Sequence, residues 1–115
     1  MFTFNDEHDC YAAELDGLVF LSEKDVPGLD ERARELAAAY RENERRIMEF
    51  ITSDDHFIAF FGRHDPDEAR EVLGVPMLDL DLEQVSYTGG FDDCHRVSFE
   101  YGGLFEELMY ISIDG

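Results

Sequence analysis

Apolar and polar residues alternate in two short runs near the start of the chain, Tyr11–Leu15 and Leu18–Leu21, on either side of Asp16-Gly17. A two-residue turn of type I′ needs positive φ at both positions, and Asp-Gly is a favoured pair there. The pattern therefore predicts a β-hairpin. The alternation of Phe2-Thr3-Phe4 indicates a short edge strand before it.

Between Asp30 and Thr52, apolar residues recur at steps of three and four. That spacing places them on one face of a single long amphipathic helix. We expect Asp30 to cap its N-terminus, with Glu31 in the first turn, where the helix dipole favours negative charge. The apolar face comprises Ala33, Leu36, Ala37, Tyr40, Ile47, Met48 and Ile51.

Two shorter helical segments are expected next. Ser53-Asp54-Asp55 fits the N-terminal cap of a helix over residues 56–61, although that aromatic run also fits a buried strand. Asp65-Pro66 offers a cap followed by proline at the first helical position, and Gly74 marks the end of that helix.

The C-terminal part of the chain returns to alternation, in residues 78–83, 96–101 and 109–113. Gly89-Gly90 and Gly102-Gly103 separate these runs, which predict a three-stranded antiparallel meander. The fold class is therefore α+β: an N-terminal β-hairpin, then one long helix plus one or two short helices packed on an antiparallel sheet. We expect the helices to cover the face of Leu80, Phe99 and Ile111 in a single domain over residues 1–115.

Composition agrees with one packed core. The chain has 115 residues, of which 44% are hydrophobic and 13% aromatic. No apolar run approaches the roughly 20 residues of a membrane helix, and the first ten residues lack the basic and apolar regions of a signal peptide. We therefore expect a cytoplasmic protein without a membrane partner, and with its two cysteines reduced.

Charge narrows the function further, because 28 acidic residues face only nine basic ones, a net charge of −19. Such a field repels nucleic acid and speeds encounter with basic partners. The surplus is uneven: residues 30–50 carry −1, whereas residues 1–29 carry −6 and residues 75–115 carry −8. A solubilising or salt-adapted surface is the alternative to a binding surface.

The best candidate contacts for a basic partner lie in the C-terminal part. Asp79, Asp81 and Glu83 alternate with leucines, so on one strand they would form a row of carboxylates suited to arginines or lysines. The row lacks the pattern of a calcium loop, and a solvated row is poor catalytic scaffolding. With the acids of the following loops, the candidate partner-binding residues are Asp79, Asp81, Glu83, Asp92, Asp93, Glu106 and Glu107.

Two aromatic residues stand beside these loop acids. Phe91 precedes Asp92, and Phe105 precedes Glu106. An aromatic anchor ringed by acids has the composition of an interface hot spot, but both residues also fit core positions at strand ends.

Metal chemistry has one weak candidate set, formed by His8, Cys10, Cys94 and His95. The two pairs could meet if the first segment paired with the strand at Cys94, although neither has usual zinc-ligand spacing. Cys94 and His95 are adjacent, so on a strand they point to opposite faces and do not form a nucleophile–base pair. No phosphate-binding loop or other catalytic motif is present, and we expect no catalytic residue and no cofactor.

The hairpin at Tyr11–Leu21, the long helix from Asp30 and the meander ending at Tyr110–Gly115 together resemble small acidic bacterial proteins of unknown function, some of which are regarded as immunity proteins of polymorphic toxin systems. The resemblance implies a protein that neutralises a toxin, often a basic nuclease, inside the producing cell. It carries over no site residues. The alternatives are a nucleic-acid mimic that inhibits a DNA-binding protein, and a small metal-dependent hydrolase.

Overall fold

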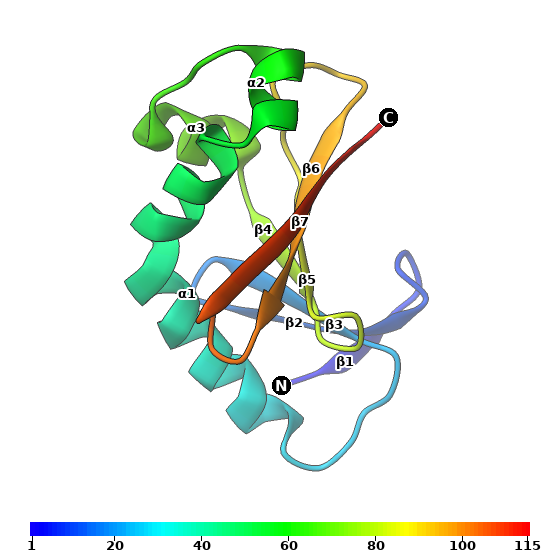
Figure 1. The fold of residues 1–115 in the computed structure, drawn as a ribbon. Helices are drawn as coiled ribbons and strands as arrows, with labels where there is room; N and C mark the ends of the chain where they lie inside the picture. Colours follow the sequence, from blue (N-terminus) through cyan, green and yellow to red (C-terminus); the bar gives the residue numbers. More distant parts are fainter.

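Seven strands lie side by side in the order of the sequence, and three helices pack on one face of the sheet they form (Figure 1). The computed structural model describes residues 1–115. The strands are β1 Thr3–Asn5, β2 Cys10–Leu15, β3 Leu18–Ser22, β4 Pro76–Asp79, β5 Gln84–Tyr87, β6 Arg96–Gly102 and β7 Glu107–Asp114. The helices are α1 Leu29–Thr52, α2 Asp55–Phe61 and α3 Pro66–Leu73.

The predicted N-terminal hairpin is confirmed as β2 and β3. Asp16 has φ 55° and Gly17 has φ 77°, as a turn with positive φ at both central positions requires. The Arg41 guanidinium on α1 donates to the Asp16 carbonyl (2.6 Å), which fixes the turn against the helix. The expected edge strand is β1, which pairs with β2.

The long helix is also confirmed, but its expected cap is wrong. The N-cap is Gly28, with φ 87°, and the helix begins at Leu29. Asp30 lies inside the first turn instead, where its carboxylate is 3.5 Å from the N-terminal ammonium group of Met1. The carboxylate is therefore still at the positive end of the helix dipole.

The two short helices begin where the sequence pattern placed them. Asp54 accepts a hydrogen bond from the Phe57 amide (3.1 Å), so residues 56–61 form a helix and not a buried strand. Asp65 accepts from the Asp67 amide (3.2 Å) at the start of α3, which ends before Gly74.

The expected three-stranded meander is wrong, because the C-terminal part contributes four strands to one seven-stranded sheet. β4 ends at Asp79, the chain turns through residues 80–83, and β5 runs back beside β4. Leu82 is 63% exposed, whereas Leu80 is 2% exposed. The strand therefore ends at Asp79, although the alternation of leucines in the sequence continues through the turn to Leu82.

The sheet is mixed and not purely antiparallel, since β3 and β4 pair in parallel. The three helices form the connection between these two neighbouring strands, which a parallel pair requires. None of the helices has the length and apolar character that crossing a membrane demands.

The helices cover one face and leave the other uncovered. On the covered face Phe20, Leu78 and Phe99 are fully buried, and Ile111 packs against the same core. The residues that alternate with them are mostly less buried, and Glu14 and Glu100 are exposed. Phe99 and Ile111 therefore lie on the covered face as expected, whereas Leu80 is buried in the turn after β4 and is not part of a strand.

Candidate functional site on the uncovered sheet face

A hollow of about 370 Å³ opens on the uncovered face, beside β2, β3 and β4. Its floor is set by the parallel pair, in which Leu21 of β3 is the register partner of Asp79 of β4. Cys10 joins it from β2, which pairs with β3. The lining residues are His8, Asp9, Cys10, Leu21, Ser22, Glu23, Asp79, Asp81 and Leu82. Four of them carry carboxylates, and none is a lysine or an arginine.

Backbone amides hold two of these carboxylates in place. Oδ1 of Asp79 accepts hydrogen bonds from the amides of Asp81 (2.9 Å) and Leu82 (3.0 Å). Oδ2 of Asp81 accepts from the amide of Glu23 (2.7 Å), across the gap between the turn and the end of β3. The second oxygen of each carboxylate has no hydrogen-bond partner within the protein, so each offers a free acceptor at the hollow.

The thiol of Cys10 belongs to the same environment. Burial and the negative charge of Asp79 raise its pKa, with smaller contributions from Asp81 and Asp9. A raised pKa favours the neutral thiol, whereas both a nucleophile and a zinc ligand need the thiolate. The carboxylates that raise this pKa also favour a cationic group in the hollow.

The structure does not bring the four metal candidates together. His8 and Cys10 line the hollow, but Cys94 and His95 precede β6. Because β3, β4 and β5 lie between β2 and β6, the two pairs are about 19 Å apart along the sheet. The pairing that would have joined them is wrong, and no group of three or more His, Cys, Asp or Glu residues is placed to hold a metal ion.

His95 has a different set of neighbours. Its Nδ1 lies 2.8 Å from Oδ2 of Asp92, and its ring lies 5.1 Å from the ring of Phe60 on α2. Asp92 also accepts from the amides of Cys94 (2.9 Å) and His95 (2.7 Å). The hydrogen bond to His95 is the main cause that lowers the pKa of Asp92. Asp92 thus shapes its own loop, while Asp93 beside it is exposed.

The predicted row of Asp79, Asp81 and Glu83 is wrong as a feature of one strand, because the chain turns after Asp79. Glu83 has φ 52°, its carbonyl accepts from the amide of Tyr101 (3.0 Å), and it does not line the hollow. Asp79 and Asp81 nevertheless meet at the hollow, through the turn and not through strand alternation.

Of the two candidate aromatic anchors, Phe105 is a core residue. It is fully buried, with Tyr40 at 5.6 Å and Tyr101 at 4.6 Å between ring centroids. Phe91 is half-buried and stacks on His64, with ring centroids 4.2 Å apart. Glu106 and Glu107 are exposed in the β6–β7 turn and at the start of β7, away from the first hollow.

Sequence reasoning missed Asp9 and Glu23 as members of the hollow. Asp9 immediately precedes β2 and Glu23 immediately follows β3, so they lie at the same end of the hairpin. The hairpin register could have placed these two together. Their approach to Asp79 depends on the parallel pairing of β3 with β4, which no local pattern shows.

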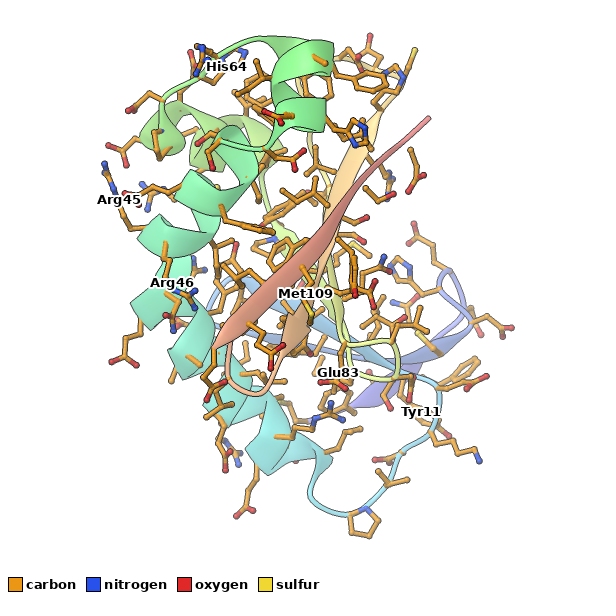
Figure 2. The ribbon with its side chains drawn as sticks, in the orientation of Figure 1. Tyr11, Arg45, Arg46, His64, Glu83 and Met109 are labelled. Carbon is orange, nitrogen blue, oxygen red and sulfur yellow. The ribbon has the colours of Figure 1, made fainter.

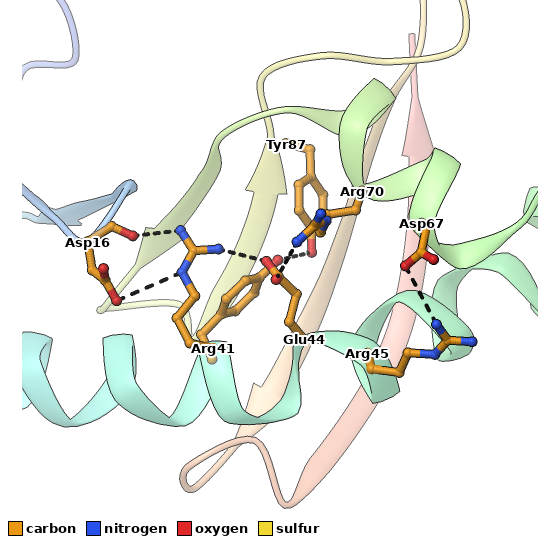
Figure 3. Close-up of polar contacts among 8 residues, drawn as sticks. Asp16, Arg41, Glu44, Arg45, Asp67, Arg70 and Tyr87 are labelled. Carbon is orange, nitrogen blue, oxygen red and sulfur yellow. Dashed lines mark hydrogen bonds and ion pairs between the residues drawn. The ribbon is translucent and has the colours of Figure 1, made fainter.

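The helix side of the sheet carries a separate polar network, which is structural (Figure 3). The hydroxyl groups of Tyr40 and Tyr87 share a buried hydrogen bond of 2.8 Å. Next to them, Glu44 accepts from Arg41 (2.7 Å) and Arg70 (3.4 Å), and its side chain is only 15% exposed. Glu44, which interrupts the apolar stripe of α1, thus joins α1 to α3.

Comparisons with protein-family models, with curated proteins and with solved structures found no match. The function is therefore inferred from the fold and its surfaces.

Proposed function

We propose that this α+β protein is an acidic binding protein that neutralises a basic partner protein by direct contact. Its role would be that of an immunity protein in the bacterial cytoplasm, and its partner a toxin such as a basic nuclease. The observation that carries the proposal is the hollow on the uncovered sheet face, where Asp9, Glu23, Asp79 and Asp81 converge without a lysine or an arginine in the lining.

The hollow has the chemistry of a receptor for a cationic side chain. Asp79 and Asp81 are held by backbone amides, so little side-chain entropy is lost when they bind. Their free oxygens can accept charge-assisted hydrogen bonds from a guanidinium or ammonium group. A volume of about 370 Å³ admits such a side chain from a protruding loop of the partner.

The remaining acids act at longer range. Asp93, Glu106 and Glu107 are exposed, and the whole chain carries −19, so the field draws a basic partner toward the protein before contact. Asp92 contributes charge, but its hydrogen bonds are used within its own loop. Asp79 and Asp81 are therefore the principal contacts.

Neither alternative function gains support from a specific observation. A nucleic-acid mimic needs regularly spaced carboxylates over a long surface, and the turn at residues 80–83 breaks the row that suggested one. A metal-dependent hydrolase needs ligands that converge, and the separation of Cys10 from Cys94 removes the set that suggested one.

The proposal is tested with the product of the gene immediately upstream, expressed alone and with this protein. Expression alone should arrest growth, and co-expression should restore it. The double variant Asp79→Asn and Asp81→Asn keeps an oxygen acceptor in each side chain but removes both charges. It should slow association with the toxin about tenfold or more and reduce its dependence on salt.

A matched control removes two charges elsewhere. Glu35→Gln on α1 and Glu71→Gln on α3 are exposed and have no ion pair. This control should associate almost as fast as the unaltered protein. An upstream product that is harmless would contradict the immunity role, and an equal loss in both double variants would rule out the hollow as the binding site.

A further inference from the structure

The outer edge of β7 is open. β7 is the last strand of the sheet and pairs only with β6, and no hydrogen bond from another part of the chain reaches its backbone. α1 runs close to the same edge and contacts β7. A hollow of about 570 Å³ lies between them. Figure 2 labels a residue on each wall, Arg46 on α1 and Met109 on β7.

Apolar side chains line this groove. Phe50, Leu108 and Met109 are each half-buried, so part of each side chain remains available for contact. The ring of Phe50 is held edge-on against Phe99 of the core, with centroids 6.0 Å apart. The groove thus has a fixed apolar floor next to a strand with unpaired backbone groups.

The rim of the groove is acidic. It carries Glu106 and Glu107, together with Glu49, whose carboxylate is paired with Arg45 (3.0 Å), and the one cation in the lining is Arg46. The guanidinium of Arg46 is already used, since it donates to the carbonyl of Phe105 and to the side chain of Asn43. Glu107 has no ion pair within the protein, and this leaves a net negative rim.

A bulge interrupts β7 just beyond the part beside the groove. Glu100 pairs with Met109 and Ser98 with Ser112, so Phe99 faces two residues of β7, the first of which is Tyr110. Tyr110 has φ 55° and is 73% exposed. Such bulges protect edge strands by interrupting a regular ladder. The segment 107–109 beside the groove is left regular.

We infer that this groove binds an extended basic segment of a partner protein, which pairs with β7 as an eighth strand. In a strand, alternate side chains point to opposite sides. Apolar side chains of the segment would contact Phe50 and Leu108 on one face, and basic ones would meet Glu107, which lies with Met109 on the other face. Main-chain hydrogen bonds would supply affinity, as in other cases of strand addition.

The acidic rim selects against a second copy of this chain as the occupant. Pairing two β7 strands would bring together two sets of the same acids, Glu106, Glu107 and Asp114, on molecules that each carry −19. The inference goes beyond the proposed function, because it concerns a different surface and does not require the partner to be a toxin.

The probe is a fluorescein-labelled octapeptide of alternating lysine and valine, with binding to the full-length protein followed by fluorescence polarisation. Two further peptides carry backbone N-methyl groups, one on all lysines and the other on all valines. In a strand, one set of amides faces β7 and the other faces solvent. One N-methylated peptide should therefore bind about tenfold more weakly or worse, while the other binds like the parent.

Protein variants locate the site. Glu107→Lys should weaken binding of the lysine–valine peptide about tenfold, whereas Glu35→Lys, the same charge change on the exposed side of α1, should weaken it about twofold or less. Asp79→Asn with Asp81→Asn should leave peptide binding unchanged, which separates this inference from the function proposed for the first hollow.

Several outcomes would overturn the inference. The first is absence of binding up to about 1 mM peptide, since so low an affinity is not specific recognition. The second is an equal effect of the two N-methylated peptides. The third is an equal loss of binding in Glu107→Lys and Glu35→Lys. Equal binding of a glutamate–valine octapeptide would remove the charge preference. Sedimentation that shows a dimer abolished by Glu107→Lys would make a second copy the occupant instead.

Discussion

At the scale of single residues, buried hydroxyl groups are the most sensitive positions. Tyr40 and Tyr87 satisfy one another through a single hydrogen bond, whereas the buried hydroxyl of Tyr101 has no partner. A buried polar group that loses its partner costs more than a pair that is removed together.

Replacing one tyrosine of the pair should therefore be worse than replacing both. Tyr87→Phe leaves the Tyr40 hydroxyl buried alone and should lower the free energy of unfolding by about 1–3 kcal/mol. The double variant Tyr40→Phe and Tyr87→Phe should lose less than the sum of the single variants, and Tyr101→Phe should lose nothing or gain. Urea unfolding at pH 7 measures all four. Strict additivity would contradict this account of the pair.

The same residues set the alkaline limit of stability. Burial raises the pKa of Tyr40 and Tyr87 well above the ordinary value of 10.0 and raises the pKa of Tyr101 to about 12. Between pH 10 and the raised pKa values, the unfolded chain releases tyrosine protons that the folded chain keeps. The contribution of these tyrosines to stability is therefore complete below pH 10 and is lost as the pH rises toward the pKa values of the folded state. Thermal unfolding between about pH 9 and 12 should show this fall. It should be smaller in the Tyr40→Phe and Tyr87→Phe double variant.

His64 is a second group whose pKa is raised, in this case by hydrogen bonds that favour its protonated form. Its Nδ1 lies 2.5 Å from Glu68 and its Nε2 lies 2.7 Å from the carbonyl of Phe61, and both contacts raise its pKa, the one with Glu68 most. The stabilising effect is therefore complete below the ordinary pKa of 6.5 and is lost as the pH rises through the raised value. Glu68→Gln should lower the pKa of His64, as followed by NMR titration of the ring protons. An unchanged pKa would show that Glu68 does not hold the imidazolium.

At the scale of elements, the contact between the β2–β3 turn and α1 has a testable geometry. Gly17 has φ 77°, and an added Cβ would lie 2.8 Å from Nη2 of Arg41. Gly17→Ala should cost about 1–2 kcal/mol from backbone strain alone, and more because Arg41 must leave the Asp16 carbonyl. In an Arg41→Ala background, the cost of Gly17→Ala should fall to that of the backbone strain alone. Equal penalties in the two backgrounds, measured by urea unfolding, would contradict the crowding.

Local patterns were sufficient for the hairpin and the helices, because Asp16-Gly17, Asp54 and Asp65 act within a few residues of themselves. They failed at residues 80–83, which form a turn. Leu80 is buried and Leu82 is exposed there, but their spacing in the sequence is the same as that of a half-buried strand. The hollow lies beyond local reasoning. His8, Cys10, Asp79 and Asp81 were each singled out from the sequence, but they meet because β3 lies parallel to β4.

At the scale of the whole molecule, like charges oppose folding. A net charge of −19 on 115 residues produces self-repulsion that salt screens. Raising sodium chloride from about 0.02 M to about 0.5 M, which shortens the Debye length severalfold, should raise Tm by several degrees. A neutral osmolyte at matched osmolality is the control, because it leaves charge repulsion in place. An equal rise with both would show that charge screening is not the cause.

The parallel pair also determines how the chain comes apart. Residues 3–22 and residues 76–114 are two antiparallel units, each built from neighbours in sequence. Between β3 and β4 they share three register pairs, Val19 with Met77, Phe20 with Leu78 and Leu21 with Asp79. Contacts between distant segments form late in folding, and weakly connected units open first. Because the acidic hollow spans this junction, a partner bound there as proposed would hold both units at once. Binding should therefore slow amide exchange at the junction and make the complex resist unfolding for longer than the free protein.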